Sequence, residues 1–361
     1  MAGFEGIQWA QHQLRFLLGA EKPELVSLDD RVPAVSKSLH YALCLAFEGI
    51  RFCCRREGRG LAVTMVNWHC NLERFRAGIA FNLSATQQHL VPTVCVLEEL
   101  LSGFLASPEL RPFLTELADK GAQGYLRPFT VDEDRSIGVH FPGLPSIRAV
   151  VCRYDSYLGE PFRGVVVPSL VRAVACNGTG CLKLGVNYLI SIKAVEAARR
   201  VDPEARSALF LDDQPQLPVA DRLLTEWDSS CCLVASTDGT VLRIPDNPLI
   251  LPSVTIRGLV ALLRDQDISV REEPLCYGEL QDLVARRALV AICSVGTAGI
   301  LNRCASLTLV DAEGRTIARH QPLIDHPLYA TLGNLKEQYW SVYRGRRAAP
   351  VGMEVKTYRL E

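Results

Sequence analysis

The segment DSYLGEPFRG (residues 155–164) constrains the fold of this chain most, because it separates two stretches that each mix helical and strand-like patterns. Its glycine, proline and charged residues favour a loop over a helix or a strand. In the stretch before it we expect three helices, at residues 8–19, 71–82 and 90–105. We also expect three strands there, at residues 61–67, 124–130 and 147–153.

The stretch after this segment shows the same mixture. A helix is expected to begin near Asn187, with three apolar side chains at helical spacing: Leu189, Ile192 and Val195. Ser253 can cap a second helix that runs to about Asp267. The strands that we expect here are residues 164–167, 231–236, 240–244 and 289–294. The middle two flank STDG, which is a hairpin signal.

Both stretches therefore predict an α+β fold, and 361 residues suit two domains of ordinary size. We place a small N-terminal α/β domain at residues 1–153 and an interdomain linker at residues 154–164. A larger C-terminal domain would then occupy residues 165–361.

The composition limits the possible partners and the compartment. Hydrophobic residues make up 48% and charged residues 22%, which is typical of a soluble globular protein. A net charge of −1 gives no electrostatic basis for binding nucleic acid. The chain has no apolar run of the roughly 18 residues that a membrane span needs, and its N-terminus does not resemble a secretion signal. We therefore expect a cytoplasmic protein without nucleic-acid or membrane partners.

The 13 cysteines do not indicate a metal site or a disulfide framework. Their number is odd, and the sequence contains no C-x-x-C. Most of them lie in apolar surroundings, where a cysteine acts as a small hydrophobic residue. The seven histidines show no metal-ligand spacing either, so we expect no metal.

Lys183 is the most informative candidate for chemistry. It lies in GCLKLGVNY, among small and apolar residues directly before a helix. Burial lowers the pKa of a lysine, and a neutral amine can form a Schiff base. The alternative is a lysine whose stem packs on the surface. The other lysines lie in polar or helical contexts where a solvated charge is expected: Lys22, Lys37, Lys120, Lys193, Lys336 and Lys356.

Lysine-based aldehyde chemistry normally uses pyridoxal 5′-phosphate, which needs a phosphate site, a carboxylate at the pyridine nitrogen and a partner for the ring hydroxyl. Residues 253–255 lie at an expected helix start, whose backbone N–H groups can bind a phosphate. Residues 296–298 (GTA) follow a buried strand and offer a second loop for an anion. Glu226 is a carboxylate near the start of a strand.

Seven short motifs, in order between about residues 43 and 345, resemble the branched-chain aminotransferase family, which are fold-type IV pyridoxal-phosphate enzymes. They are AFEGIR (46–51), NLERF (71–75), GYLRPF (124–129), KLGVNY (183–188), TEWDSSC (225–231), LPSVT (251–255) and SVGTAG (294–299). Each motif is weak alone, and the order of all seven makes the resemblance specific.

The resemblance implies a two-domain fold-type IV architecture. In this family, the cofactor lies at the interface between a small N-terminal α/β domain and a larger C-terminal domain that carries the Schiff-base lysine and a β-barrel-like sheet. It also implies a homodimer. The implied activity transfers an amino group between a branched-chain-like amino acid or related amine and a 2-oxo acid such as 2-oxoglutarate.

The resemblance also implies roles for individual residues. Lys183 would be the catalytic lysine that forms the Schiff base with the cofactor. The cofactor would also be held by Arg74 at its phosphate, Tyr188 at its ring hydroxyl, Glu226 at its pyridine nitrogen, and by Val254, Thr255 and Thr297. The substrate would contact Phe47, Tyr125, Arg127, Thr297 and Ala298.

The chain departs from the family pattern at Ala42, Trp227, Cys231, Ser253 and Ile256. Trp227 replaces a glycine and would be a bulky change near the cofactor ring. These departures leave two alternatives open: a lyase of the same fold and cofactor, or a non-catalytic homologue that binds pyridoxal phosphate. A separate alternative for Arg127 is a structural ion pair with Glu48 or Asp132.

Overall fold

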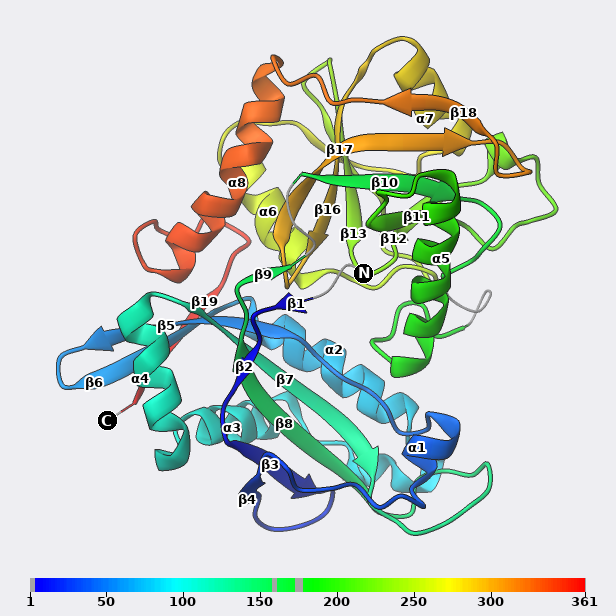
Figure 1. Cartoon of the computed structure of the whole chain (residues 1–361). Coiled ribbons are helices and arrows are strands. Elements are labelled where there is room, and N and C mark those ends of the chain that lie inside the picture. The colour runs from blue at the N-terminus through cyan, green and yellow to red at the C-terminus, as the bar shows by residue number, and fades with distance from the viewer. Residues whose placement is uncertain (1–3, 158–160, 173–177, 361) are drawn as a thin grey trace.

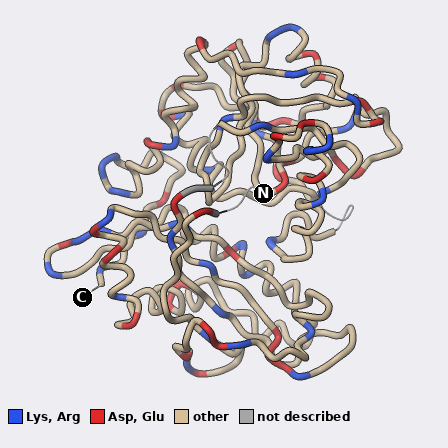
Figure 2. The backbone as a smooth tube through the Cα atoms, in the orientation of Figure 1, with Lys and Arg blue, Asp and Glu red and all other residues tan. Residues whose placement is uncertain are grey.

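The computed structural model describes residues 4–157, 161–172 and 178–360. Two large sheets, each with its own helices, lie one above the other in Figure 1. A small antiparallel pair, β1 (Phe4–Glu5) and β9 (Ser156–Tyr157), lies between them. Basic and acidic residues are interspersed over both halves (Figure 2), in keeping with the net charge of −1.

The first sheet has eight strands in the order β19-β6-β5-β7-β8-β3-β4, with β2 paired to β8. Its strands are β2 (Gln8–Trp9), β3 (His12–Leu17), β4 (Glu24–Ser27), β5 (Ile50–Glu57), β6 (Gly60–Val66), β7 (Gln123–Asp132), β8 (Pro145–Arg153) and β19 (Val355–Leu360). The helices of this half are α1 (Lys37–Tyr41), α2 (Trp68–Phe81), η1 (Ala85–Leu90), α3 (Val94–Leu105), η2 (Pro108–Leu110) and α4 (Arg111–Lys120).

The second sheet has nine strands in the order β12-β11-β10-β17-β16-β13-β14-β15, with β18 paired to β17. Its strands are β10 (Phe162–Val167), β11 (Ser207–Leu211), β12 (Leu224–Trp227), β13 (Cys231–Ser236), β14 (Val241–Arg243), β15 (Val270–Glu272), β16 (Leu289–Gly296), β17 (Ile300–Val310) and β18 (Thr316–His320). The helices of this half are η3 (Gly185–Asn187), α5 (Tyr188–Val201), η4 (Val219–Asp221), α6 (Val254–Arg264), α7 (Tyr277–Ala285) and α8 (Pro327–Tyr343).

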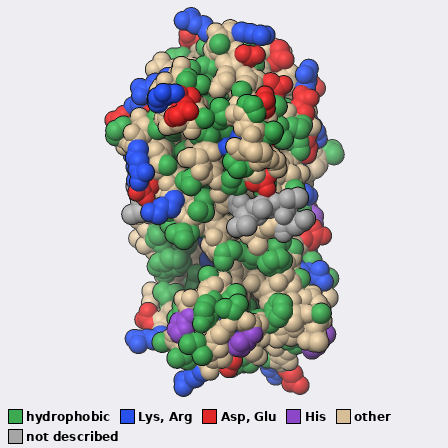
Figure 3. All heavy atoms as spheres, turned by 90° about the vertical axis from the view of Figure 1, so that its right-hand side faces the viewer, with side chains coloured by type: hydrophobic (Ala, Val, Ile, Leu, Met, Phe, Trp, Pro, Cys, Tyr) green, Lys and Arg blue, Asp and Glu red, His purple; other side chains and the backbone are tan. Residues whose placement is uncertain are grey.

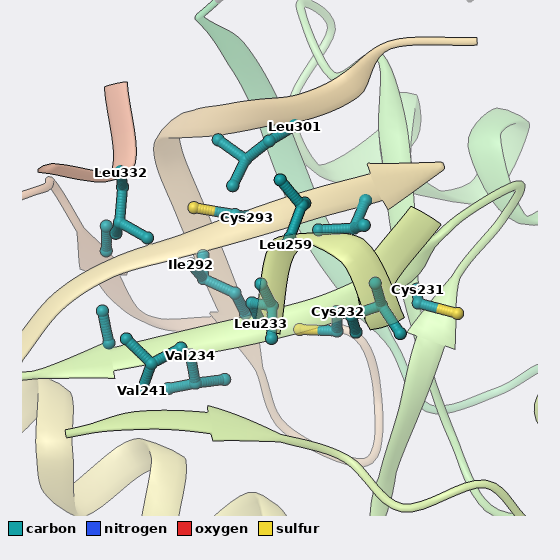
Figure 4. Close-up of a cluster of buried hydrophobic side chains, with 14 of the residues drawn as sticks. Cys231, Cys232, Leu233, Val234, Val241, Leu259, Ile292, Cys293, Leu301 and Leu332 are labelled. Carbon is teal, nitrogen blue, oxygen red and sulfur yellow. The ribbon is translucent and has the colours of Figure 1, made fainter. Parts of the chain in front are cut away.

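Each sheet has its own apolar core. In the second half, side chains of β13, β14 and β16 meet Leu259 of α6 and Leu332 of α8 (Figure 4). Cys232 and Cys293 are fully buried in this cluster, and burial raises the pKa of the Cys232 thiol well above its ordinary value. These cysteines therefore act as small apolar side chains, as their sequence context predicts.

One predicted helix is wrong. Residues 8–19 form β2 and β3 instead, and β3 pairs with both β4 and β8. Leu14 lies opposite Ala149, and both are buried. Cross-strand pairing and burial against the sheet therefore override the local apolar spacing that suggested a helix.

The other predicted segments have the expected type, with shifted ends. The helix expected over residues 90–105 starts only at Val94, because Pro92 precedes it and Thr93 caps it by accepting a hydrogen bond from Val96 N at 3.3 Å. The cap predicted at Ser253 is confirmed, with Ser253 Oγ accepting from Ile256 N at 3.2 Å. No helix among the described residues is long and apolar enough to cross a membrane.

The domain limits remain predictions. The first sheet's β8 ends at Arg153, and β10 of the second sheet begins at Phe162, two residues before the predicted end of the linker. The last strand, β19, returns to pair with β6, so the end of the chain lies in the first sheet.

Candidate active site

A cavity of about 280 Å³ lies between the two halves and brings together most of the predicted site residues. The N-terminal half contributes Phe47, Gly49, Arg74, Tyr125 and Arg127. The C-terminal half contributes Arg172, Lys183, Tyr188, Glu226, Ser229, Ser230, Cys231, Leu251, Ser253, Val295, Gly296, Thr297 and Ala298. Of the predicted residues, only Val254 and Thr255 do not line the cavity: they are buried behind Ser253 in the first turn of α6.

The amine of Lys183 faces two aromatic rings, those of Phe47 and Tyr188. Lys183 Nζ donates to Tyr188 OH at 3.1 Å and lies 4.9 Å from the centre of the Phe47 ring. The Lys183 backbone is fixed from the other half, since its carbonyl accepts from Phe47 N at 3.0 Å. Lys183 therefore lies where the two halves meet, and a backbone hydrogen bond from the N-terminal half fixes its position.

Tyr188 begins α5 and is the hydrogen-bond partner of this amine. Burial alone would raise the pKa of its phenol. The positive charges of Lys183 and Arg172 outweigh burial, and the net pKa lies below its ordinary value. Tyr188 can therefore share a proton with a neighbouring group more readily than an ordinary tyrosine.

Glu226 is buried on β12 with three partners around its carboxylate. Its Oε1 accepts from Leu251 N at 2.9 Å and lies 2.6 Å from Arg172 Nη1, and Cys231 Sγ lies 3.9 Å from Oε2. Burial raises the pKa of Glu226 to about 7, although the charge of Arg172 and the hydrogen bond from Leu251 act in the opposite direction. This carboxyl group can therefore change its protonation near neutral pH.

Arg74 reaches the cavity from α2 and is held by a buried carboxylate. Its Nε and Nη2 donate to the two oxygens of Glu48 at 2.7 and 2.6 Å, and its Nη1 donates to Pro252 O at 2.6 Å. Burial would raise the pKa of Glu48, but Arg74 lowers it below its ordinary value. Arg74 thus lies beside Ser253, the cap of α6, so a positive charge and a helix N-terminus meet at one end of the cavity.

Tyr125 and Arg127 share one face of β7, as the period of two predicts. Arg127 Nη2 donates to Tyr125 OH at 2.7 Å, and its guanidinium lies 4.8 Å from the centre of the Phe47 ring. The alternative ion pairs of Arg127 do not form, because Glu48 binds Arg74 and Asp132 binds Lys37.

The loop that carries Thr297 and Ala298 is held from the first sheet. Arg51 of β5 donates to both carbonyl oxygens, with 2.8 Å between its Nε and Thr297 O. Tyr154 OH donates to Ala298 O at 2.9 Å. The last residue of the AFEGIR motif therefore positions a loop on the opposite side of the cavity.

Trp227 is fully buried and does not line the cavity, so the prediction of a bulky change near the cofactor ring is wrong. Successive residues of a strand point to opposite faces, and Glu226 takes the cavity face. Trp227 packs edge-on against Phe162 at 5.2 Å between ring centres and donates to Cys293 O at 3.1 Å.

Of the other four departures from the family pattern, two line the cavity and two do not. Cys231 and Ser253 line the cavity, whereas Ile256 lies in the core and Ala42 ends α1 with a left-handed backbone, at φ 55°. Cys231 Sγ donates to Leu251 O at 3.3 Å, and burial raises the pKa of its thiol to about 12. Cys231 is therefore a protonated, neutral part of the wall.

Lys37 also differs from its expected solvated state. It is fully buried, with Nζ 3.2 Å from Asp132 Oδ2 and 3.0 Å from His140 Nδ1. The polar sequence around Lys37 does not predict this burial, because both partners lie far along the chain. Lys37 thus has a carboxylate partner, whereas the hydrogen-bond partner of Lys183 is a phenol.

Arg172 is the site residue that the sequence did not reveal. It is buried and paired with Glu226, and its guanidinium carbon lies 5.9 Å from the centre of the Tyr188 ring. The one available signal is its position in VVVPSLVR, where a lone arginine that follows a buried strand needs a carboxylate partner. In the described parts of the chain, no group of three or more His, Cys, Asp or Glu side chains could hold a metal ion.

Curated proteins with a similar sequence are aminotransferases. This chain is 27% identical to branched-chain-amino-acid transaminase 1 of Bacillus subtilis over 203 residues, which cover 55% of this chain and 54% of that protein. It is 25% identical to transaminase AMT5 of Alternaria alternata over 202 residues, 54% of this chain and 50% of that protein. The match thus spans about half the length of these relatives. No protein-family model matches the sequence.

Solved structures with the same fold are branched-chain aminotransferases. The enzyme of Thermoproteus uzoniensis, solved with norvaline, matches with a TM-score of 0.68 and 21% identity over 95% of this chain and 99% of that one. The Escherichia coli enzyme gives 0.68 and 20% over 96% and 98%, and the pyridoxal-phosphate form from Thermobaculum terrenum gives 0.65 and 14% over 96% and 99%. The predicted fold-type IV, α+β architecture is therefore confirmed. So is the resemblance to the branched-chain aminotransferase family, in sequence and in fold.

Proposed function

We propose that this chain is a pyridoxal-phosphate-dependent aminotransferase. It would transfer an amino group between a branched-chain-like amino acid or a related amine and a 2-oxo acid such as 2-oxoglutarate. The observation that carries the proposal is the Lys183 amine, hydrogen-bonded to Tyr188 in a cavity that also holds Glu226 and Arg74. The similar curated proteins named as aminotransferases support the same activity.

The residues present fit the cofactor. Arg74 and the first turn of α6, with Val254 and Thr255, would hold its phosphate together with Thr297, while Tyr188 would meet the ring hydroxyl and Glu226 the pyridine nitrogen. Arg172 adds an independent observation, because its Nε is buried without a hydrogen-bond partner among the described residues, although the side chain lines the cavity. When bound, pyridoxal phosphate supplies an aldehyde that reacts with amines and a ring that accepts electrons.

Lys183 would be the covalent attachment point and then, as a free amine, would move a proton between the substrate α-carbon and C4′ of the cofactor, first as general base and then as general acid. Tyr188, whose pKa is lowered, would keep this amine oriented through their hydrogen bond. Glu226 would hold a proton at the pyridine nitrogen, for which its carboxyl must be ionised. The charge of Arg172 favours that state against burial.

The substrate would lie between Phe47, the Tyr125–Arg127 pair and the Thr297–Ala298 loop. Arg51 and Tyr154 bind the carbonyl oxygens of this loop, and the N–H of a peptide points away from its carbonyl. This geometry favours an N–H of the loop as donor to the substrate carboxylate, next to Tyr125. Arg127 would bind the side-chain carboxylate of glutamate as amino donor.

We also propose a homodimer. Figure 3 shows exposed hydrophobic side chains among polar and charged ones on the face that it draws. The exposed apolar residues include Leu189 and Ile192 of α5, at 66% and 62%, which are two of the three apolar positions at helical spacing noted in the sequence. Ile137 and Val139, in the loop after β7, are 74% and 78% exposed. A second copy of the chain would cover such residues.

Light scattering coupled to gel filtration tests the dimer. The parent should have twice the mass of the chain. Leu189→Glu with Val139→Glu should give a monomer that keeps the parent's circular dichroism. A parent that elutes as a monomer at micromolar concentration contradicts the dimer. We further propose that the enzyme works in the cytoplasm, where its many buried thiols would stay reduced.

The activity is tested by 2-oxo acid formation from a panel of amino acids with 2-oxoglutarate as acceptor. An aminotransferase produces glutamate in equal amount to the new 2-oxo acid, and Lys183→Ala abolishes both. A lyase would instead release product without 2-oxoglutarate. A non-catalytic homologue would show the absorbance of the bound cofactor and no turnover with any donor.

A further inference from the structure

A second cavity, of about 420 Å³, lies in the C-terminal half and shares no lining residue with the cavity around Lys183. It is formed where α7 ends, β16 begins and β18 ends, and α7 and β18 lie close together in Figure 1. Its lining residues are Val284, Arg287, Leu289, Arg319, His320, Gln321, Pro322 and Leu323.

The lining carries positive charge without compensation. Arg287 and Arg319 both line the cavity, and none of the lining residues is an aspartate or a glutamate. Within the described chain, neither arginine has an ion pair or a side-chain hydrogen bond. The neighbouring Arg286 differs, because it lies 3.7 Å from Asp282 and is not part of the lining. Both arginines are exposed, so an anion that enters the cavity can reach both guanidinium groups and is attracted by both charges.

His320 adds a neutral polar group to the same wall. Its side chain is only 6% exposed, and its Nε2 is buried with no hydrogen-bond partner among the described residues. Burial lowers the pKa of His320 to about 4, so the ring is uncharged at neutral pH. A neutral imidazole can donate one hydrogen bond and accept another, and it adds no further positive charge to the cavity.

The rest of the lining is apolar. Leu289, Leu323 and Val284 are all partly or fully buried and would contact carbon atoms rather than oxygens. Arginine forks suit the paired oxygens of a carboxylate or a phosphate. The combination of two guanidinium groups, a neutral imidazole and an apolar wall fits an anion with a short carbon chain.

We propose that this cavity binds a small organic anion that carries carboxylate or phosphate groups, with Arg287 and Arg319 as donors to its oxygens. The site is separate from the catalytic cavity, and it does not depend on the proposed aminotransferase activity.

Isothermal titration of the full chain with inorganic phosphate and, separately, with succinate tests the proposal. The key variant combines Arg287→Asn with Arg319→Gln. Asparagine suits position 287 because its backbone is left-handed, at φ 54°. Arg286→Gln is the matched control, since it removes a neighbouring charge outside the cavity.

The parent should bind at least one probe saturably, and the double variant should bind it at least about tenfold more weakly, whereas Arg286→Gln binds as the parent does. Tighter binding of phosphate indicates a phosphate-bearing ligand, and tighter binding of succinate indicates a dicarboxylate. Unchanged melting temperatures show that the variants fold. Binding that the double variant retains in full belongs to another site and overturns the proposal, as does the absence of saturation with both probes.

Discussion

Arg172 and Glu226 form a buried ion pair at the wall of the cavity around Lys183, with 2.6 Å between Nη1 and Oε1. Glu226 is the residue expected to meet the cofactor's pyridine nitrogen, and burial raises its pKa to about 7 although the charge of Arg172 acts in the opposite direction. Arg172 therefore favours the ionised carboxylate and holds the pKa near neutral pH rather than above it.

We predict that Arg172→Met raises the pKa of Glu226 further, because it removes the nearest positive charge. A protonated Glu226 cannot hold a proton at the pyridine nitrogen, so cofactor affinity at pH 7 should fall by about tenfold for each pKa unit of the shift. The measurement is cofactor affinity between pH 6 and 9, with Arg172→Lys as a control that retains the charge. An identical pH dependence in the parent and Arg172→Met would show that Arg172 does not act through Glu226.

The same carboxyl makes the stability of the cofactor-free protein depend on pH. The pKa of Glu226 is raised on folding from its ordinary value of 4.5 to about 7, so the folded state binds its proton more tightly than the unfolded state does. Its stabilising contribution is therefore full below pH 4.5 and is lost as the pH rises through 7. The loss is on the order of 3 kcal/mol.

Glu226→Gln should remove this dependence. We expect the free energy of unfolding, measured with denaturant between pH 4.5 and 8, to decline less steeply for the variant than for the parent. The variant also leaves Arg172 unpaired, but that cost is constant with pH, so slopes rather than absolute values are compared. Parallel curves for the two proteins contradict the raised pKa.

Arg74→Ala should weaken cofactor binding by about tenfold to a hundredfold, because a charge-assisted phosphate contact contributes about 1.5–3 kcal/mol. It should also destabilise the fold by about 3–5 kcal/mol, since it leaves the Glu48 carboxylate buried and unpaired. The double variant Glu48→Gln with Arg74→Gln separates the two effects. It should recover most of the stability and none of the affinity, and full recovery of affinity would make Arg74 purely structural.

The sequence predicts this site well where one short motif carries both a side chain and the element that positions it. Tyr125 and Arg127 lie two residues apart on a strand, so the period of two alone places them on one face. The same rule, applied to Glu226 and Trp227, would have placed Trp227 in the core. The predicted site residues accordingly line the cavity, with Val254 and Thr255 as the exceptions.

Contacts between distant segments could not be predicted in this way. Arg172 forms an ion pair with Glu226, and Lys37 forms one with Asp132. Each carboxylate lies on a strand from another part of the chain. The strand at residues 12–17 is also fixed by pairing with β4 and β8, against its local helical spacing. Single-sequence patterns record which side chains alternate, but not which strand lies beside them.

Lys183 should be the lysine that binds the cofactor covalently. The loaded protein should absorb near the boundary of violet and visible light, and borohydride reduction followed by peptide mapping should label the peptide that contains Lys183. Lys37 is the internal control, because it is buried too but paired with Asp132. Label on Lys37, Lys120 or Lys193 would contradict the assignment. Lys183→Ala should keep the fold and lose turnover.

The choice of amino donor rests on Arg127 and Tyr125, which face the cavity together. A guanidinium beside a phenol suits the side-chain carboxylate of glutamate. An apolar donor side chain would leave the free N–H groups of Arg127 without a partner, which costs about 1–3 kcal/mol for each unsatisfied group.

Arg127→Leu should therefore slow the half-reaction with glutamate much more than the half-reaction with leucine, by at least about tenfold in kcat/KM. The structural alternative is weakened by the geometry, because Glu48 and Asp132 pair with Arg74 and Lys37 rather than with Arg127. Tyr125→Phe is the matched control: it removes the hydrogen bond that orients Arg127 but keeps the charge, so its effect on the glutamate half-reaction should be smaller. Equal losses with glutamate and leucine in Arg127→Leu would show that Arg127 supports the cavity wall and does not select the donor.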